Sequence, residues 1–296
     1  MAPPGLVIVD KPVGMTSHDV VARLRRLLGT RRVGHAGTLD PMATGVLVCG
    51  VERATKLLGH LALDTKAYLA TVRLGTSTST DDALGEPIGG ADASAVSGAA
   101  VRVGLATLTG DIEQVPSAFS AVKVGGRRAY ELARAGEQVM LAARAVTVYR
   151  FDLLELRHGE AVTDLDVAVE CSSGTYVRAL ARDLGATLGV GGHLTALRRT
   201  RVGPFGLATA RTLDALADRP ELSLPLDAAV LASFRPRDVD AAQAGALSHG
   251  GRIPPAGIAG THAAVDPDGH AVALLTEQGG QARPVLVLRP GNGGTG

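Results

Sequence analysis

Residues 34–45 read Gly34-His35-Ala36-Gly37-Thr38-Leu39-Asp40-Pro41-Met42-Ala43-Thr44-Gly45, and they form the most unusual stretch of the chain. Three glycines and one proline hold an aspartate in a short loop. Because Asp40 precedes Pro41, helical backbone is disfavoured there, and the glycines let a bulky substrate approach the carboxylate closely. An Asp-Pro turn that caps the next helix is the commoner use of this pair. The segment therefore predicts either a catalytic carboxylate or a turn residue.

The segments upstream of this loop predict a strand and then a helix. The apolar run Leu6–Val9 ends in the turn-forming residues 10–14, which is typical of a buried strand followed by a turn. Thr16 offers a helix N-cap, the apolar residues of 20–28 follow helical spacing, and Gly29 supplies a stop.

The segments downstream of the loop predict a helix, a strand and a second loop. Residues 52–63 have the spacing of an amphipathic helix, and residues 66–74 alternate as a strand with Tyr68 on its apolar face. A tyrosine on a strand is more often part of the core than a catalyst. Residues 75–90 are polar, include the pair Asp81-Asp82, and predict a loop.

A second candidate for chemistry lies at residues 171–178. The alternating strand Leu165–Cys171 leads through the turn Ser172–Thr175 into a helix over 177–188. Arg178 then lies early in the helix, where it can pair with a carboxylate from another loop. The alternative is a surface arginine on an amphipathic helix.

The charge distribution is more informative than the net charge, which is only +1. Basic stretches (1–60, 117–150 and 176–211) alternate with acidic ones, and on one face they could neutralise a phosphate backbone. Residues 117–145, with Lys123, Arg127 and Arg128 between glycines, predict a basic excursion from the core. Arg198 and Arg199 fit either a phosphate-contacting rim or an ordinary solvated edge.

Several classes of protein are not supported by the sequence. There is no apolar stretch long enough to span a membrane and no export signal. Cys49 and Cys171 form no ligand pattern, which favours a reducing cytoplasm. The eight histidines are scattered and no glycine-rich nucleotide motif occurs, so we expect no metal site and no nucleotide cofactor.

The sequence pattern changes near the C-terminal end of the chain. After about Ala232, glycine and proline turns alternate with short strands such as Ala271–Leu275, and residues 266–269 form a turn signal. We therefore expect one large domain over residues 1–232, a small β-rich domain over 233–290, and a disordered tail over 291–296.

Together these segments resemble the bacterial tRNA pseudouridine-55 synthase family, of the TruB type. The resemblance covers most of residues 5–205 and depends on five motifs in order. These are Gly5–Gly14 with Lys11-Pro12, Gly34–Gly45 with His35 and Asp40, Lys66-Ala67-Tyr68, Cys171–Leu180 with Tyr176 and Arg178, and His193–Thr200 with Leu197.

The resemblance implies an α+β fold: a mixed, largely antiparallel pseudouridine-synthase-like sheet flanked by helices, with a small C-terminal β-rich domain that is PUA-like. This chain's version of that domain is short and not basic. The implied reaction isomerises one uridine in the T-arm loop of tRNA to pseudouridine. Nothing is added or lost, so the resemblance implies no cofactor and no metal. The implied partner is tRNA, with no membrane association, and we expect a monomer.

The resemblance also assigns roles. Asp40 would act on the sugar, with Arg178 as its ion-pair partner, and Tyr68 would stack on the uracil and could remove its C5 proton. His35 would fill the space that the flipped base leaves in the RNA, and Tyr176 and Leu197 would line the pocket. Lys11 and Pro12 would support the floor of the site, and Lys123, Arg127, Arg128, Arg198 and Arg199 are candidates for contacts with the RNA backbone.

Two other functions remain open on the sequence. A catalytically silent tRNA-binding or chaperone protein could keep the same fold, although it would not need both Asp40 and Arg178. A hydrolase could pair Asp40 with another carboxylate, and turnover of single nucleosides would favour it.

Overall fold

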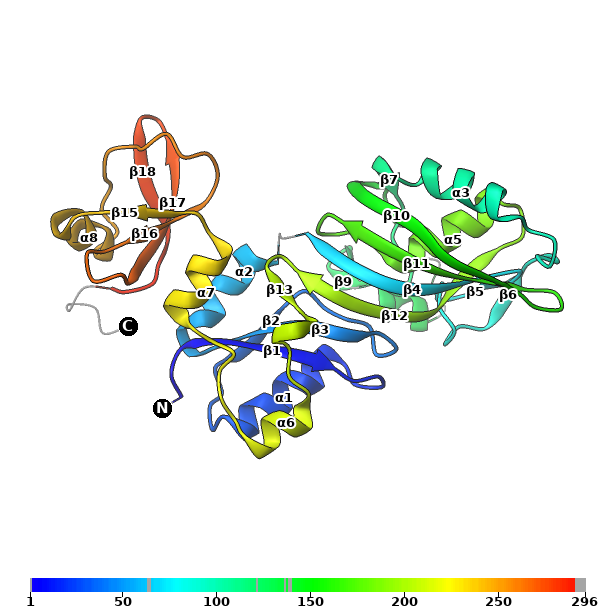
Figure 1. Cartoon of the computed structure of the whole chain (residues 1–296), viewed down its shortest axis with the longest axis horizontal. Coiled ribbons are helices and arrows are strands. Elements are labelled where there is room, and N and C mark those ends of the chain that lie inside the picture. The colour runs from blue at the N-terminus through cyan, green and yellow to red at the C-terminus, as the bar shows by residue number, and fades with distance from the viewer. Residues whose placement is uncertain (1, 63–64, 121, 136, 138–139, 291–296) are drawn as a thin grey trace.

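The computed structural model describes residues 2–62, 65–120, 122–135, 137 and 140–290. Its main feature is a ten-stranded sheet whose order is β14-β1-β3-β12-β4-β11-β10-β7, with β2 paired to β3 and β13 paired to β12 (Figure 1). The strands are β1 (Gly5–Lys11), β2 (Val33–Ala36), β3 (Thr44–Val51), β4 (Lys66–Leu74), β7 (Gly110–Gln114), β10 (Arg144–His158), β11 (Thr163–Cys171), β12 (Gly192–Val202), β13 (Phe205–Gly206) and β14 (Leu224–Pro225).

All pairs in this sheet are antiparallel except β3 with β12. That parallel pair is short, joining Arg198 to Thr44 and Arg199 to Gly45. The mixed, largely antiparallel sheet expected from the resemblance is confirmed. The parallel pair matters because it brings β12 against the strand that directly follows the Asp40 loop.

Helices cover both faces of the sheet. They are α1 (Ser17–Leu27), α3 (Gly98–Thr107), α5 (Val177–Thr187), α6 (Leu213–Asp218) and α7 (Leu226–Ser233), with a 3₁₀ turn η2 (Leu207–Thr209). Thr16 and Asp19 form a capping box at the start of α1, which satisfies backbone N–H groups that a helix start leaves unpaired. Val7 and Val9 of β1 pack with α1 and α6, whereas Leu6 and Ile8 belong to the core on the opposite face.

The predicted alternation of β4 is confirmed. Tyr68, Ala70, Val72 and Leu74 are all buried and belong to one core, to which α3 and α5 contribute. This places Tyr68 in the same core as Leu39, which lies in the Asp40 loop, and Leu197 of β12.

The single helix expected over residues 52–63 is wrong. The described part of this segment forms a 3₁₀ helix η1 (Glu52–Leu57) and a short helix α2 (Leu58–Leu61), and Leu63 lies outside the described residues. Glu52 follows β3 directly with a φ of 53°, and Val51 provides no side-chain cap. A φ of 53° lies outside the right-handed helical region, so a regular α-helix cannot begin at Glu52.

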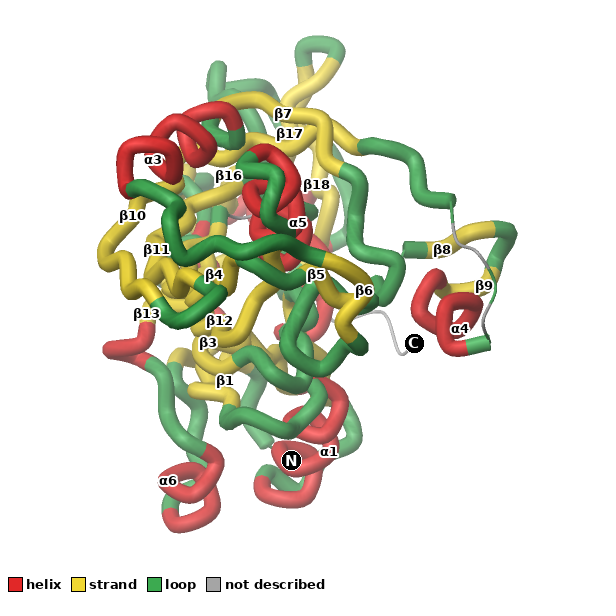
Figure 2. The backbone as a smooth tube through the Cα atoms, turned by 90° about the vertical axis from the view of Figure 1, so that its right-hand side faces the viewer, coloured by secondary structure: helices red, strands yellow, loops and turns green. Residues whose placement is uncertain are grey.

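Two other segments contain more structure than expected. Residues 75–90 include the hairpin β5 (Ser77–Thr78) and β6 (Pro87–Gly89). The basic excursion contains the hairpin β8 (Lys123–Val124) and β9 (Arg127–Arg128) followed by α4 (Ala129–Arg134). Figure 2 shows this unit standing out from the body of the molecule.

The C-terminal part forms a separate four-stranded sheet of β15 (Pro236–Asp238), β16 (His262–Val265), β17 (Ala271–Gln278) and β18 (Gln281–Val287). It also contains α8 (Ala241–Ser248), which the sequence pattern did not predict although Asp240 and Gln243 form a capping box. Leu274 and Leu288 share one core with Leu6 and Ile8, so the two sheets are packed together through α7 (Figure 1). The expected tail, 291–296, lies outside the described residues. No described helix is long and apolar enough to cross a membrane.

Candidate active site

The Asp40 loop joins β2 to β3 and is fixed at several points. The amide of Leu39 donates to the Ser17 hydroxyl at 2.9 Å, and that hydroxyl lies 3.2 Å from the Leu39 carbonyl. The amide of Gly14 donates to the Pro41 carbonyl at 2.8 Å. A strand follows the loop, so Asp40 does not cap a helix, and that interpretation of the Asp-Pro pair is wrong.

Lys11 lies below this loop at the end of β1. Its fully buried ammonium donates to the carbonyls of Pro12 at 2.9 Å and Met15 at 2.7 Å, with a longer contact of 3.4 Å to Pro41. Burial lowers the pKa of this group to about 8, against an opposing effect of the Asp40 charge. Lys11 therefore ties the turn after β1 to the loop that carries Asp40, as a supporting residue would.

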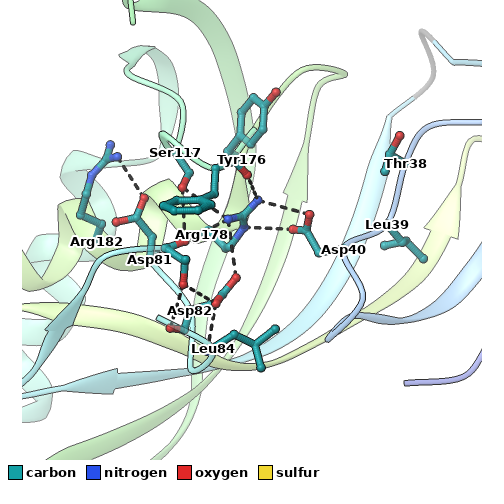
Figure 3. A network of polar contacts seen from close by, with 12 residues as sticks. Thr38, Leu39, Asp40, Asp81, Asp82, Leu84, Ser117, Tyr176, Arg178 and Arg182 are labelled. Atoms are coloured by element: carbon teal, nitrogen blue, oxygen red, sulfur yellow. Dashed lines mark hydrogen bonds and ion pairs between the residues drawn. The ribbon is translucent and has the colours of Figure 1, made fainter. Parts of the chain in front are cut away.

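Arg178 is at the centre of the site, in the first turn of α5 (Figure 3). Its guanidinium, only 4% exposed, faces Asp40, whose side chain is 36% exposed. Nη2 donates to Oδ1 of Asp40 at 3.2 Å, and Nε lies 2.9 Å from Oδ2 in an ion pair that is too bent for a hydrogen bond. A planar fork thus holds both carboxylate oxygens, and the carboxylate keeps one open side.

The same guanidinium holds two further loops. Nη1 donates to the Thr80 carbonyl at 2.9 Å and to the Ser117 hydroxyl at 3.3 Å, and Nη2 donates to the Phe119 carbonyl at 2.9 Å. Ser117 and Phe119 lie where the chain leaves the body for the basic excursion. Arg178 therefore connects the Asp40 loop, the loop after β5 and the base of the excursion.

Asp82 is the site residue that sequence reasoning missed. Its carboxylate, 6% exposed, lies 3.5 Å from Nη1 of Arg178, so the arginine is shared by two carboxylates (Figure 3). Beside it, Asp81 pairs with Arg182 at 3.3 Å and has a φ of 60°, while burial raises the pKa of Asp81. The only sequence signal was an acidic pair in a loop, which is usually solvated.

Tyr68 and Leu197 face the site from the adjacent strands β4 and β12. Tyr68 lies directly opposite Arg199 in the strand register. Burial raises the pKa of Tyr68, and the Arg199 charge acts in the opposite direction. Leu197 lies opposite Ala70 and is buried in the same core.

His35 and Tyr176 lie at the ends of elements that border the site. Burial lowers the pKa of His35, so its ring is neutral near pH 7, and it contacts His18 edge-on with ring centroids 5.4 Å apart. Tyr176 occupies the N-cap position of α5, and its backbone N–H and carbonyl both bond to the side chain of Gln114.

The residues predicted to contact the RNA backbone differ in their exposure to solvent. Arg199 is 1% exposed, so a contact with a surface phosphate is wrong for this residue. Arg198, 39% exposed, forms a bidentate pair with Asp10 and lines an open cavity of about 380 Å³ beside Arg23. Arg127 is exposed and pairs with Glu137 at 2.9 Å. The side chains of Lys123 and Arg128 are outside what the structure describes.

One group of potential metal ligands occurs in the described part of the chain, and it is not at this site. Asp266, Asp268 and His270 lie in the turn between β16 and β17. Asp266 Oδ1 accepts the backbone N–H groups of Asp268 at 3.0 Å and His270 at 2.8 Å. The turn geometry accounts for this cluster.

Comparison with known proteins identifies the chain. Residues 25–177 match the model of the TruB family pseudouridylate synthase N-terminal domain. Residues 178–231 match a tRNA pseudouridylate synthase B C-terminal domain, and residues 234–289 match the tRNA pseudouridine synthase II C-terminal model.

Whole-chain comparisons agree. A tRNA pseudouridine synthase B of Nocardia farcinica is 64% identical over 286 residues, which cover 97% of this chain and 94% of the relative. A chain in the crystal structure of a Cbf5-Nop10-Gar1 complex is 28% identical with a TM-score of 0.75, covering 97% of this chain and 85% of that one. A chain in the structure of an H/ACA RNP bound to a substrate RNA containing 2′-deoxyuridine is 26% identical with a TM-score of 0.72. The match covers 97% of this chain and 85% of that one. The chain therefore belongs to the TruB family of pseudouridylate synthases.

Proposed function

We propose that this protein isomerises uridine-55 in the T-arm loop of tRNA to pseudouridine, with Asp40 as the nucleophile. The observation that carries the proposal is the pairing of an accessible Asp40 carboxylate with the buried guanidinium of Arg178. The names of the relatives, tRNA pseudouridine synthase B, support tRNA as the substrate.

The reaction is an exchange of glycosidic bonds within one nucleotide. The N1–C1′ bond breaks, the base turns, a C5–C1′ bond forms, C5 loses its proton and N1 gains one. A carboxylate suits this chemistry because it can attack C1′ or remove a sugar proton. Asp40 must act in its ionised form, and the guanidinium of Arg178 offsets the desolvation that this loop imposes on the charge.

The remaining pocket residues act on the flipped base. Extracting a base from a folded loop costs a few kcal/mol, and an aromatic stacking partner returns about 1–3 kcal/mol. We assign stacking to Tyr68, the pocket walls to Leu197 and Tyr176, and the bracing of the vacated RNA stack to His35. The neutral state of His35 suits this role because a neutral ring can lie among bases without an ion partner.

The RNA is held by parts of the molecule outside the pocket. We assign backbone contacts to the excursion 117–145 and to Arg198, whose guanidinium lies in an open cavity next to Arg23, a residue with no polar partner among those described. We place the domain boundary at residues 232–233 and propose that the protein acts as a monomer.

The test is site mapping of pseudouridine on an unmodified tRNA transcript treated with the pure protein. We expect one modified position, in the T-arm loop, and none with Asp40→Asn, which should bind the tRNA with nearly unchanged affinity. Turnover by Asp40→Asn would remove the nucleophile from the mechanism. Binding without any modification by the native protein would instead identify a silent tRNA-binding protein.

A further inference from the structure

Arg199 is the largest fully buried side chain described in the protein. Nε donates to the Val46 carbonyl at 2.7 Å, and the Nη atoms lie 3.0 Å and 3.4 Å from the carbonyls of Gly37 and Thr38. All of these acceptors are neutral. Within the described ranges, no carboxylate forms an ion pair with this guanidinium.

An uncompensated buried charge is costly. Removing an ion from water costs several kcal/mol even after the protein relaxes, and an apolar side chain of similar volume is often at least as stable in such a position. Arg178, the other buried arginine of the site, has its charge balanced by Asp40 and Asp82. The difference suggests that the charge of Arg199 is kept for a task other than stability.

The contacts of Arg199 show where that charge acts. Its side chain holds Gly37 and Thr38, which precede Asp40 in the loop, and Arg199 lies directly opposite Tyr68 in the β4–β12 pair, where its charge acts on the Tyr68 hydroxyl. The backbone of Arg199 lies very close to Gly45, which follows the loop. A Cβ on residue 45 would lie 2.1 Å from the Arg199 carbonyl oxygen. One residue thus fixes both ends of the Asp40 loop relative to Tyr68.

We propose that Arg199 is a positioning residue for the isomerisation, and that its charge stabilises the negative charge on the uracil stacked on Tyr68. This rests on the proposed function. When the N1–C1′ bond breaks, its electron pair stays with the base, which becomes an anion until C5 attacks C1′. The anion forms whether Asp40 attacks C1′ or removes a sugar proton, so the proposal holds for both routes. A fixed cation in a dry site is suited to such a charge.

The first test needs no RNA. The chain has four tyrosines and no tryptophan, so tyrosinate absorbance can be followed through an alkaline titration, and Tyr68→Phe identifies the Tyr68 component. Arg199→Gln should raise the pH at which Tyr68 ionises. Arg201→Gln is the matched control, because Arg201 is on the same strand but pairs with Glu170, and it should leave that pH unchanged. An unchanged Tyr68 titration in Arg199→Gln would overturn the proposal.

The second test separates positioning from folding by single-turnover kinetics at saturating enzyme. Arg199→Gln should slow isomerisation by about 10²-fold or more with tRNA affinity within about twofold of native, and Arg199→Lys should recover at least tenfold because it restores the charge. Equal rates in the Lys and Gln variants would show that Arg199 only holds the fold.

Two outcomes complete the design. If Arg199→Gln does not fold, Arg199→Lys decides alone: a loss of more than about tenfold in the single-turnover rate overturns the proposal, and a smaller loss supports it. If the native protein makes no pseudouridine while the Tyr68 titration shifts as expected, the proposed function fails and the link between Arg199 and Tyr68 still stands.

Discussion

The guanidinium of Arg178 has five partners, and their directions decide what can replace it. Two are carboxylates, two are backbone carbonyls and one is a hydroxyl. A lysine keeps the charge but presents it as a point with three donors on a flexible stem. It cannot reach the Asp40 loop, Thr80 and Phe119 at once, so buried acceptors lose their donors.

We therefore expect Arg178→Lys to lower the free energy of unfolding by about 2–4 kcal/mol, since each unsatisfied buried group costs about 1–3 kcal/mol. The single-turnover rate should fall by at least about 10²-fold because Asp40 loses its fork. Urea unfolding and rapid-quench kinetics measure the two effects. Arg182→Lys is the control, because Arg182 is more exposed and pairs with Asp81. It should lower the free energy of unfolding and the single-turnover rate by less than Arg178→Lys does. Native stability and rate in Arg178→Lys would mean that charge alone suffices.

Lys11 gives a prediction about pH. Its folded-state pKa of about 8 is below the ordinary value of 10.5, so between these pH values the unfolded chain binds more protons than the native protein. Stability from this group therefore rises with pH across that range, by up to about 3 kcal/mol. Relative to Lys11→Met, the native protein should gain this amount between pH 7 and 11 in chemical unfolding experiments. If the free energies of unfolding of the two proteins change with pH in the same way, the expectation is wrong.

At the scale of elements, the excursion of β8, β9 and α4 has an exposed ion pair that RNA can replace. Arg127 and Glu137 are both about half exposed, and surface pairs of this kind contribute about 0–1 kcal/mol. A phosphate can therefore take the place of the carboxylate at little cost. The basic residues of the sequence pattern are thus held on a unit that projects from the body (Figure 2).

Arg127→Gln should weaken tRNA binding and flatten the log–log dependence of affinity on salt, by up to about one unit for each phosphate that the variant no longer neutralises. Glu137→Gln should strengthen binding, because it removes a competitor for Arg127 and a repelling charge. Filter binding at several salt concentrations measures both, and the rate at saturating enzyme should change less than the affinity. Changes of the same sign in the two variants would show that the pair does not compete with RNA.

At the scale of the whole molecule, the two sheets share a core. Leu274 of β17 is fully buried together with Leu6 and Ile8 of β1, and the Arg53 side chain donates to the Leu288 carbonyl at 2.8 Å. Such packing couples the C-terminal sheet to the body that carries the site. We expect the parts to unfold together.

Leu274→Ala should cost about 2–5 kcal/mol and lower the midpoint of one heat-unfolding transition rather than split it. Circular dichroism and loss of isomerisation should report the same midpoint. Val285→Ala, on the exposed side of β18, should change stability by no more than about 0.5 kcal/mol. A separate early transition in Leu274→Ala would show that the C-terminal sheet folds independently.

Local pattern was sufficient for the parts of this fold whose burial depends on near neighbours in the chain. The alternation of β4 and β11, the apolar run of β1 and the capped start of α1 follow from the spacing of their side chains, because these spacings report which face is covered. The glycines and proline around Asp40 likewise identified a constrained loop. The early position of Arg178 in α5 indicated a partner from elsewhere, and the family resemblance named that partner as Asp40, which the structure shows.

Tertiary structure alone decided the other polar partners of the site. Arg198 and Arg199 are identical side chains at adjacent positions, yet the strand pleat points one toward Asp10 at the surface and the other into the interior, against the carbonyls of Gly37 and Val46. Asp82 reaches Arg178 from a loop almost a hundred residues earlier, in a segment whose composition is typical of a solvated turn. Composition and periodicity describe only a residue's own neighbourhood. The partners of these charges depend on strand order and register, which long-range packing of the whole chain determines.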